Sequence, residues 1–466
     1  MCIRDRNYVF SDTETTGLHE TDFIQIIQSA SILTDTEFNI LDTQNILSKP
    51  LPWVIPTPGA FVTHKQIGSL DSNRSHYQMM KEIYDTWQNW SFNKKTIFFT
   101  YNGHRFDEEL YRRQFYWNLL PSFTTNTNGN GRSDIMFLML LFSYLYPDAI
   151  DYEKNKYDVP MLSLGKILSR IGVDVADAHD ALKDTEFTIE LMKFVAKINK
   201  DLITDFLELS TKESYLNYLN TRKYFGFVDK MFGQIYTYPL TFLTLNPEDT
   251  NKAIFLDLSW PFEDVLDMDY AELISCIAKP NKESPFKVIP INKSRALLDA
   301  SKFDFRFEIS QTELAKRADI VSSNIDFKEK VMAACGDIIP RSYPEKKYVD
   351  EMVYGGFPSA GDALLCEQFH QTDTFEEKQK ILLNFEDFRY RELAKRILYV
   401  HYPDQISQED RKSIEDLIKT RWTVEEDKAW PSPEKAKIEF FKEMERDDLD
   451  KLQKEILEKL KPLFND

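Results

Sequence analysis

The 466-residue chain contains few cysteines, and this shortage excludes two kinds of stabilising site. The four that are present, Cys2, Cys276, Cys335 and Cys366, lie far apart and form no Cys-x-x-Cys pair. Neither a disulfide framework nor a structural zinc site is therefore predicted. A reducing compartment fits this composition, so we expect a cytoplasmic protein.

The sequence also lacks a hydrophobic run long enough to cross a bilayer. Its strongest apolar run, Ile135 to Phe142, is much shorter than the ~20 residues of a membrane-spanning helix, and a buried helix is predicted there instead. No secretory signal peptide is recognisable. The first six residues, MCIRDR, look like translated sequencing-adapter read-through, so they are excluded from the fold prediction and the true start of the chain stays open.

Positive charge is scarce, with 58 Lys and Arg against 76 Asp and Glu and a net charge of −18. Coating of nucleic acid without specificity needs the opposite balance, because the phosphate backbone is a polyanion. An acidic enzyme can nevertheless carry a local basic groove. Composition alone therefore leans mildly against a nucleic-acid-binding function.

The length and the 42% hydrophobic content indicate a globular protein with two to four domains. Residues 7–197 alternate between strand-like and helical patterns, which predicts an α/β domain with helices packed on a mixed sheet. Residues 198–345 contain short strand-like pieces and predict a small β-rich domain, and residues 346–466 predict a charged helical domain. No repeat of fixed period is visible, and nothing suggests more than a monomer.

Within the first domain, strands are predicted at Tyr8–Ser11, Ile24–Thr34 and Thr96–Thr100. The last of these, TIFFT, is a continuous apolar run, as expected of a strand that is buried on both faces. Helices are predicted after Asp107, Asp134 and His179, and residues 121–133 are predicted to form a long polar loop.

Four acidic residues stand at junctions between predicted elements. Asp12 and Glu14 end the first strand, and their spacing of two places both side chains on one face of it. Asp107 follows the loop that leaves the TIFFT strand, and Asp184 lies about one turn into the helix that follows His179. Such a group of carboxylates would repel one another unless cations lay between them.

Hard oxygen ligands select Mg²⁺ or Mn²⁺ rather than zinc. Two such ions ~3.5–4 Å apart form the usual clamp for phosphodiester hydrolysis, in which one activates water and the other steadies the leaving oxygen. His179 would accept the proton of the water, since an imidazole titrates near neutral pH. The pattern thus predicts Asp12, Glu14, Asp107 and Asp184 as metal ligands and His179 as general base.

Each motif also has an ordinary structural interpretation. An Asp-x-Glu at a strand end is most often solvated, Asp180 could be a simple helix N-cap, and the acidic start of the Asp107 helix is favoured by the helix dipole. The order and context of the motifs favour the catalytic interpretation, because their joint occurrence by chance is rare.

The motifs DTETTG at Asp12, NGHRFDEE at Asn102 and HDALKD at His179 resemble the DEDDh exonuclease superfamily, and more narrowly the exonuclease I family. Later blocks extend the resemblance to nearly the full length. They are MFGQIYTYPLTFLTLNPEDTNKAIFLDL at Met231, INKSRALLD at Ile291, YGGFPSAGD at Tyr354 and FRYRELAKRILYVHYP at Phe388.

The resemblance implies a ribonuclease H-like exonuclease domain, an SH3-like domain and a helical C-terminal domain. It implies 3′-to-5′ hydrolysis of single-stranded DNA to 5′-mononucleotides with two Mg²⁺ ions, processively, in DNA repair and recombination. The acidic tail of single-stranded DNA-binding protein is an implied partner. The same catalytic and metal roles are implied for the five residues above.

The chain departs from the family pattern at two places. The family continues to Thr-Gly-Ile after the PTPGA segment, a segment that the resemblance places near the terminal nucleotide, whereas this chain has Thr63, His64 and Lys65. Tyr146 stands where the family has a basic residue. An aromatic side chain cannot pair with an acidic tail, so docking of that partner has less support than catalysis.

An acidic enzyme must still hold a polyanion, and several polar and basic residues are candidates. The run from Phe388 to Arg396 and the segment TRKYFG interleave cations with aromatic rings that could stack on bases. The bland alternative is an intrahelical pair between Glu392 and Arg396, with Tyr390 and Phe388 in the core. The predicted substrate-binding residues are Thr13, Thr15, Arg105, Lys223, Lys230, Arg389 and Arg396.

Two other functions remain open at this point. One is an RNA-trimming or proofreading exonuclease of the DEDDh type, which the family blocks after residue 200 disfavour because such enzymes are typically short. The other is a non-catalytic scaffold that binds DNA or protein, which the presence of all five catalytic candidates disfavours.

Overall fold

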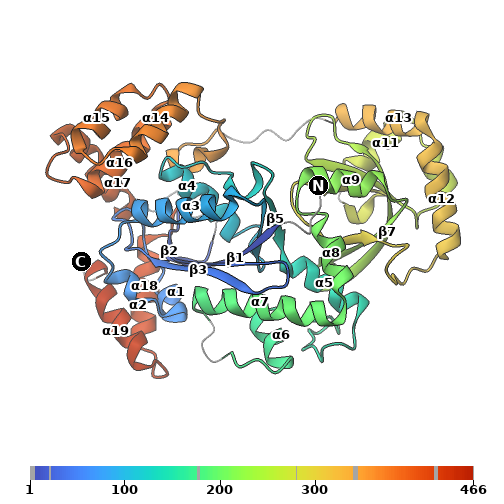
Figure 1. Cartoon of the computed structure of the whole chain (residues 1–466), viewed down its shortest axis with the longest axis horizontal. Coiled ribbons are helices and arrows are strands. Elements are labelled where there is room, and N and C mark those ends of the chain that lie inside the picture. The colour runs from blue at the N-terminus through green and yellow to red at the C-terminus, as the bar shows by residue number, and fades with distance from the viewer. Residues whose placement is uncertain are drawn as a thin grey trace.

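In the computed structural model, the structure describes residues 6–19, 23–175, 179–279, 281–338, 345–423 and 429–464. Residues 1–5, most of the segment attributed to read-through, lie outside the described residues. Two five-stranded sheets and a group of C-terminal helices make up the architecture (Figure 1). No helix in the described ranges combines the length and the apolar character needed to cross a membrane.

The first sheet is mixed and has the strand order β3-β2-β1-β4-β5. β1 pairs antiparallel with β2 and parallel with β4, and β4 pairs parallel with β5. All five residues of β4 are buried, as its apolar sequence predicts. The mixed α/β architecture of the first region is therefore confirmed. The strands are β1 (Asn7–Thr15), β2 (Ile26–Thr34), β3 (Ile40–Leu47), β4 (Thr96–Thr100) and β5 (Gly131–Asp134).

Alternation along β1 decides which helices cover which face. Tyr8 and Phe10 belong to the core shared with α5 and α7, whereas Val9 belongs to the core shared with α3 and α4. Side chains two residues apart on a strand point to the same face, so Asp12 and Glu14 lie on the same face as Tyr8 and Phe10. This is the face that α7 covers. The helices of this region are α1 (Pro58–His64), α2 (Ile67–Leu70), α3 (His76–Phe92), α4 (Asp107–Trp117), α5 (Ile135–Leu145), α6 (Leu164–Arg170) and α7 (Ala181–Ile198).

One prediction for this region needs correction. Residues 121–133 are not a loop throughout, because β5 begins at Gly131. The strand is polar in sequence, GRSD, yet all four residues are buried against neighbouring segments. Parallel pairing with β4 therefore makes this segment a buried strand, although its polar sequence predicts a loop.

The second sheet is entirely antiparallel, with the order β10-β6-β7-β8-β9. This confirms the β-rich middle region, and its core is continuous with that of α5 and α7. The strands are β6 (Phe225–Met231), β7 (Gln234–Leu245), β8 (Lys252–Asp257), β9 (Phe286–Pro290) and β10 (Leu297–Asp299). The helices around it are α8 (Lys200–Leu207), α9 (Lys212–Asn220), α10 (Phe262–Leu266), α11 (Tyr270–Ile277), α12 (Gln311–Ser323) and α13 (Ile325–Gly336).

The C-terminal region is helical, as predicted, and packs on the first sheet domain at two places. Its helices α14 and α16 contact α3 and α4 through the pairs Tyr77–His370 and Tyr116–Tyr390, and its α18–α19 hairpin packs against α1 (Figure 1). These helices are α14 (Ala360–Gln371), α15 (Phe375–Asn384), α16 (Phe388–His401), α17 (Gln408–Thr423), α18 (Pro433–Met444) and α19 (Lys451–Leu460).

A buried ion-pair triad holds the helical region together. Asp350 is 2% exposed and accepts from Arg396 at 2.8 Å and from Arg421 at 2.9 Å. Asp350→Asn should destabilise this region by about 3 kcal/mol, because two buried guanidinium groups lose their counter-charge. Calorimetric unfolding measures the loss. Asp448→Asn, which removes an exposed pair with Arg446, is the control, and an equal loss in both variants would contradict the prediction.

Candidate active site and metal centre

Three of the predicted metal ligands meet in the structure. One carboxylate oxygen from each of Asp12, Glu14 and Asp184 lies within 4.8 Å of the others. β1 supplies the first two from one face, and the first turn of α7 supplies the third. The start of α7 is set by Asp180, whose side chain caps the backbone N–H groups of Leu182 and Lys183.

Asp107, the first residue of α4, is buried beside this cluster. Its Oδ1 accepts a hydrogen bond of 2.5 Å from the hydroxyl of Thr13, the residue between the two β1 carboxylates. The loop before it is tight: a Cβ at Gly103 would lie 2.5 Å from the Thr100 side chain and 2.6 Å from Asp107 Oδ2. Glycine is therefore required for the loop to bring Asp107 to the site.

Asp134, the N-cap of α5, was not among the predicted site residues and helps to position this loop. Its carboxylate accepts from the backbone N–H of Asn102 at 2.7 Å and from that of His104 at 3.2 Å. The only sequence signal for this role is an aspartate directly before an apolar helix. Such an aspartate is common as a simple cap.

The electrostatics of the cluster favour binding of a cation, because burial and mutual repulsion make the ionised carboxylates costly. Burial, together with Asp184 and Asp107, raises the pKa of Glu14 to about 9. Burial also raises the pKa of Asp107 to about 7, against the hydrogen bond from Thr13, and raises that of Asp12 well above its usual range. No Lys or Arg forms an ion pair with these carboxylates in the described part of the chain. Oxygen ligands without a Lys or Arg partner fit a hard divalent ion such as Mg²⁺.

The raised pKa values predict that metal binding displaces protons. Without metal the folded site retains protons up to about pH 7 at Asp107 and about pH 9 at Glu14, and binding of Mg²⁺ requires the ionised carboxylates. Mg²⁺ affinity should therefore rise as pH increases from 6 to 9. Calorimetric titration in buffers of different ionisation enthalpy measures the protons released. Affinity that is independent of pH would contradict this account of the site.

His179 is exposed and sits directly before the Asp180 cap with a positive φ of 73°. Burial raises the pKa of Asp184, and the neighbouring His179 opposes that rise. His179 therefore lies near Asp184 and remains open to solvent. This placement is compatible with the predicted general base.

Residues 63–66, which include the segment that departs from the family pattern, contact the backbone and side chains next to the carboxylates. His64 is buried, and burial lowers its pKa to about 4. Its Nε2 donates to the Thr15 carbonyl at 3.2 Å, and its Nδ1 accepts from the backbone N–H of Gln66. The Gln66 side chain donates to Asp180 at 3.1 Å. Through these hydrogen bonds, His64 and Gln66 connect the end of β1 to the start of α7.

Of the predicted substrate-binding residues, Thr13 and Thr15 are buried next to the cluster, and Thr15 donates to the Gly17 carbonyl at 2.7 Å. Arg105 is exposed in the loop before Asp107. Lys223 is also exposed but pairs with Asp319 at 2.8 Å, and Lys230 donates to the Pro160 carbonyl at 3.1 Å.

Two predicted DNA contacts are corrected by the structure. The Arg389 side chain is only 8% exposed, pairs with Asp387 at 2.7 Å and donates to the Met352 and Gly356 carbonyls. Arg396 belongs to the buried triad of Asp350. Their guanidinium groups already have protein partners, so neither is free to bind phosphate. Three of the aromatic residues predicted to stack on bases, Tyr224, Phe225 and Tyr390, are likewise buried.

Fold and site together define an α/β protein with a carboxylate centre suited to divalent metal, flanked by a second sheet and a helical region. The Exonuclease I C-terminal domain family matches residues 347–465. The chain is 27% identical to Exodeoxyribonuclease I of Escherichia coli, over 81% of this chain and 84% of the relative. It is 26% identical to Exodeoxyribonuclease I of Buchnera aphidicola, over 83% of this chain and 95% of the relative.

Solved structures extend the likeness to the whole fold. An Exonuclease I from Methylocaldum szegediense superposes with a TM-score of 0.79 at 20% identity and covers 99% of both chains. E. coli Exonuclease I in complex with an oligonucleotide gives a TM-score of 0.78 at 22% identity and covers 98% of both chains. The resemblance to the exonuclease I family is therefore confirmed over most of the chain.

Proposed function

We propose that this protein is an exodeoxyribonuclease that hydrolyses single-stranded DNA from the 3′ end and releases 5′-mononucleotides. The observation that carries the proposal is the group of carboxylates with no Lys or Arg ion-pair partner among the described residues. It lies on a chain that resembles exodeoxyribonuclease I over most of its length. A scaffold that only binds DNA would have no reason to bear the electrostatic cost of this group.

In the proposed mechanism Asp12, Glu14, Asp107 and Asp184 hold two Mg²⁺ ions, for which Mn²⁺ can substitute. When bound, such ions activate water and stabilise charge on the phosphate. Thr13 and Asp134 keep Asp107 in place, the first through its hydroxyl and the second through the loop before α4. His179 accepts the proton of the attacking water from its exposed position beside Asp184.

We also propose a division of the chain into three domains. Residues 7–197 would form a ribonuclease H-like DEDDh exonuclease domain, 198–345 an SH3-like domain and 346–466 the helical domain. The antiparallel order of the second sheet and the family match at 347–465 support this division. Closure of the outer domains around the strand would make digestion processive.

Single-stranded DNA is the proposed partner, in line with relatives whose structures contain it. Docking of the acidic tail of single-stranded DNA-binding protein, a monomeric state and a role in repair and recombination are also proposed. The Tyr146 hydroxyl accepts a hydrogen bond from Asn199, and its ring packs on Phe142. Tyr146 carries no positive charge, so it would not itself pair with the acidic tail.

A timed digest of 3′- and 5′-labelled single- and double-stranded DNA with Mg²⁺ tests the function, with matched RNA oligonucleotides in parallel. Stepwise loss of the 3′ label from single-stranded DNA is expected. Faster loss of RNA would favour the RNA-trimming alternative. No degradation with any metal would favour the scaffold.

A further inference from the structure

A buried glutamine, Gln28, bridges the first sheet and the start of α7. Gln28 lies on β2 and is 1% exposed. Its Nε2 donates to Asp180 Oδ2 at 2.9 Å, and its Oε1 accepts from the backbone N–H of Ala181 at 3.2 Å. The same Nε2 also donates to Asn45 on β3 at 3.1 Å. Both ends of the amide are thus used, one on the cap residue of α7 and the other on the first residue of the helix.

The place of Gln28 in the sheet relates it directly to the metal-binding carboxylates. In the antiparallel pairing of β1 with β2, Gln28 is the residue opposite Glu14. Side chains of opposite residues lie on the same face of a sheet, with Cβ atoms about 4.5–5.5 Å apart. Gln28 therefore stands beside Glu14 on the face that α7 covers, and its amide connects this strand pair to the helix.

The start of α7 carries the two residues that this bridge would place. His179 comes directly before the cap with a φ of 73°, and Asp184 lies in the first turn, where its N–H donates to the Asp180 carbonyl at 2.9 Å. Neither residue belongs to the sheet, so the position of Asp184 relative to Asp12 and Glu14 depends on where the helix begins. A displacement of about 1 Å at a catalytic group can lower a rate on the order of 10²-fold.

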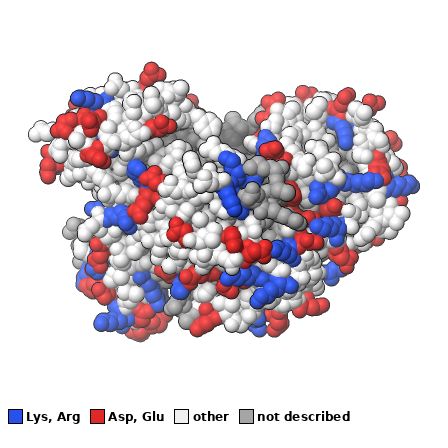
Figure 2. Space-filling model, in the orientation of Figure 1, with Lys and Arg blue, Asp and Glu red and all other residues white. Residues whose placement is uncertain are grey.

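A second neutral side chain holds the same carboxylate. Gln66 Nε2 donates to Asp180 Oδ2 at 3.1 Å, while Asp180 Oδ1 accepts from the first backbone N–H groups of α7. Lys and Arg are spread among the acidic residues over the face shown in Figure 2, yet Gln28 and Gln66 are uncharged amides. A neutral donor fixes the carboxylate without placing a positive charge beside the metal ligands, where it would compete with a bound cation.

We propose that Gln28 is a positioning residue for the hydrolysis. By fixing the start of α7 against β2, it sets the distance from Asp184 and His179 to the strand carboxylates. The proposal rests on the proposed function and adds a residue that acts through Asp180 rather than on the DNA. Loss of a residue that orients metal ligands in this way costs roughly 10–100-fold in metal affinity or activity.

The test compares wild type with Gln28→Met, which keeps the size of the side chain but removes its hydrogen bonds. Calorimetric titration of the DNA-free protein with Mg²⁺ should show affinity weakened about tenfold. At saturating Mg²⁺, kcat for single-stranded DNA should fall roughly 10–100-fold with KM within about twofold of wild type, because contacts to the substrate are intact. Gln28→Asn, which is one methylene shorter, should show the same losses and serves if Gln28→Met does not fold.

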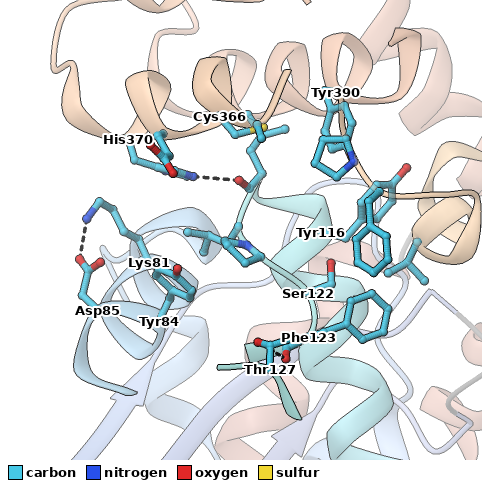
Figure 3. A pocket seen from close by; sticks show the side chains of 18 of the residues that line it. Lys81, Tyr84, Asp85, Tyr116, Ser122, Phe123, Thr127, Cys366, His370 and Tyr390 are labelled. Atoms are coloured by element: carbon cyan, nitrogen blue, oxygen red, sulfur yellow. Dashed lines mark hydrogen bonds and ion pairs between the residues drawn. The ribbon is translucent and has the colours of Figure 1, made fainter. Parts of the chain in front are cut away.

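Two variants control for the general cost of removing buried hydrogen bonds. Gln25→Met removes another buried glutamine, whose amide bonds the segment 48–51 instead of α7. Tyr77→Phe removes a hydrogen bond to His370, which lies on the wall of an apolar cavity of about 450 Å³ between α3, α4 and α14 (Figure 3). α3 packs on the other face of the sheet. Both controls should melt at a lower temperature, as Gln28→Met should, but keep the wild-type kcat, KM and Mg²⁺ affinity.

An exchange of donor and acceptor tests the bond itself. Gln28→Glu places a second carboxylate against Asp180 and should lower kcat at least as far as Gln28→Met does. Addition of Asp180→Asn returns a donor to the pair and keeps a good helix cap. The double variant should therefore regain about tenfold in kcat over Gln28→Glu.

The proposal is overturned if Gln28→Met and Gln28→Asn keep the wild-type Mg²⁺ affinity and kcat, or if KM rises while kcat holds. An equal loss of kcat in Gln25→Met, or a double variant no more active than Gln28→Glu, would overturn it as well. Absence of digestion by the wild-type protein refutes the proposed function instead, and the Mg²⁺ titration then still decides whether Gln28 positions the carboxylates.

Discussion

Asp184→Asn should lower the rate of 3′-end hydrolysis at least ~10³-fold. The amide keeps the size of the side chain but removes one charge from a ligand set whose oxygens lie within 4.8 Å of one another. Loss of metal-centred stabilisation of several kcal/mol corresponds to that factor. The measurement is the initial rate of nucleotide release from single-stranded DNA at saturating Mg²⁺.

The same substitution should not unfold the protein. Asp184 is partly exposed, and its charge adds to the repulsion that raises the pKa of Glu14. Metal-free Asp184→Asn should therefore melt no lower than metal-free wild type. Asp151→Asn, at an exposed carboxylate of the same domain, is the control and should retain full activity. Wild-type rates in rigorously purified Asp184→Asn protein would remove this carboxylate from the mechanism.

His179→Ala should lower the rate about 10²–10⁴-fold, the usual contribution of a positioned general base. Metal binding should be largely retained, because the imidazole is exposed and the carboxylates remain in place. The rise in melting temperature caused by Mg²⁺ reports that binding.

His19→Ala, another exposed histidine, is the matched control. If His179→Ala abolished the Mg²⁺-induced rise in melting temperature, His179 would be a metal ligand rather than a base. A variant that keeps the wild-type rate would exclude it from both roles.

The placement of Asp12 and Glu14 on one face was predictable because it depends only on strand periodicity. The start of α7 was predictable for a similar local reason, since Asp180 followed by a helical pattern is an N-cap signal. Convergence of the first strand with a helix about 170 residues later was predicted from motif order. Periodicity alone does not supply that convergence.

The roles of Arg389 and Arg396 were not predictable, because their partners are set by tertiary structure. Asp350, which binds Arg396, lies 46 residues away, and the carbonyls that Arg389 binds lie 37 and 33 residues away. A helix with the sequence FRYRELAKR looks the same whether its cations face solvent or a buried carboxylate.

Crystals soaked in Mn²⁺ and measured for anomalous scattering test the central claim most directly. The account predicts density among the oxygens of Asp12, Glu14 and Asp184, with Asp107 in reach of it. A well-soaked crystal with no anomalous peak there, or with manganese bound only elsewhere, would contradict it.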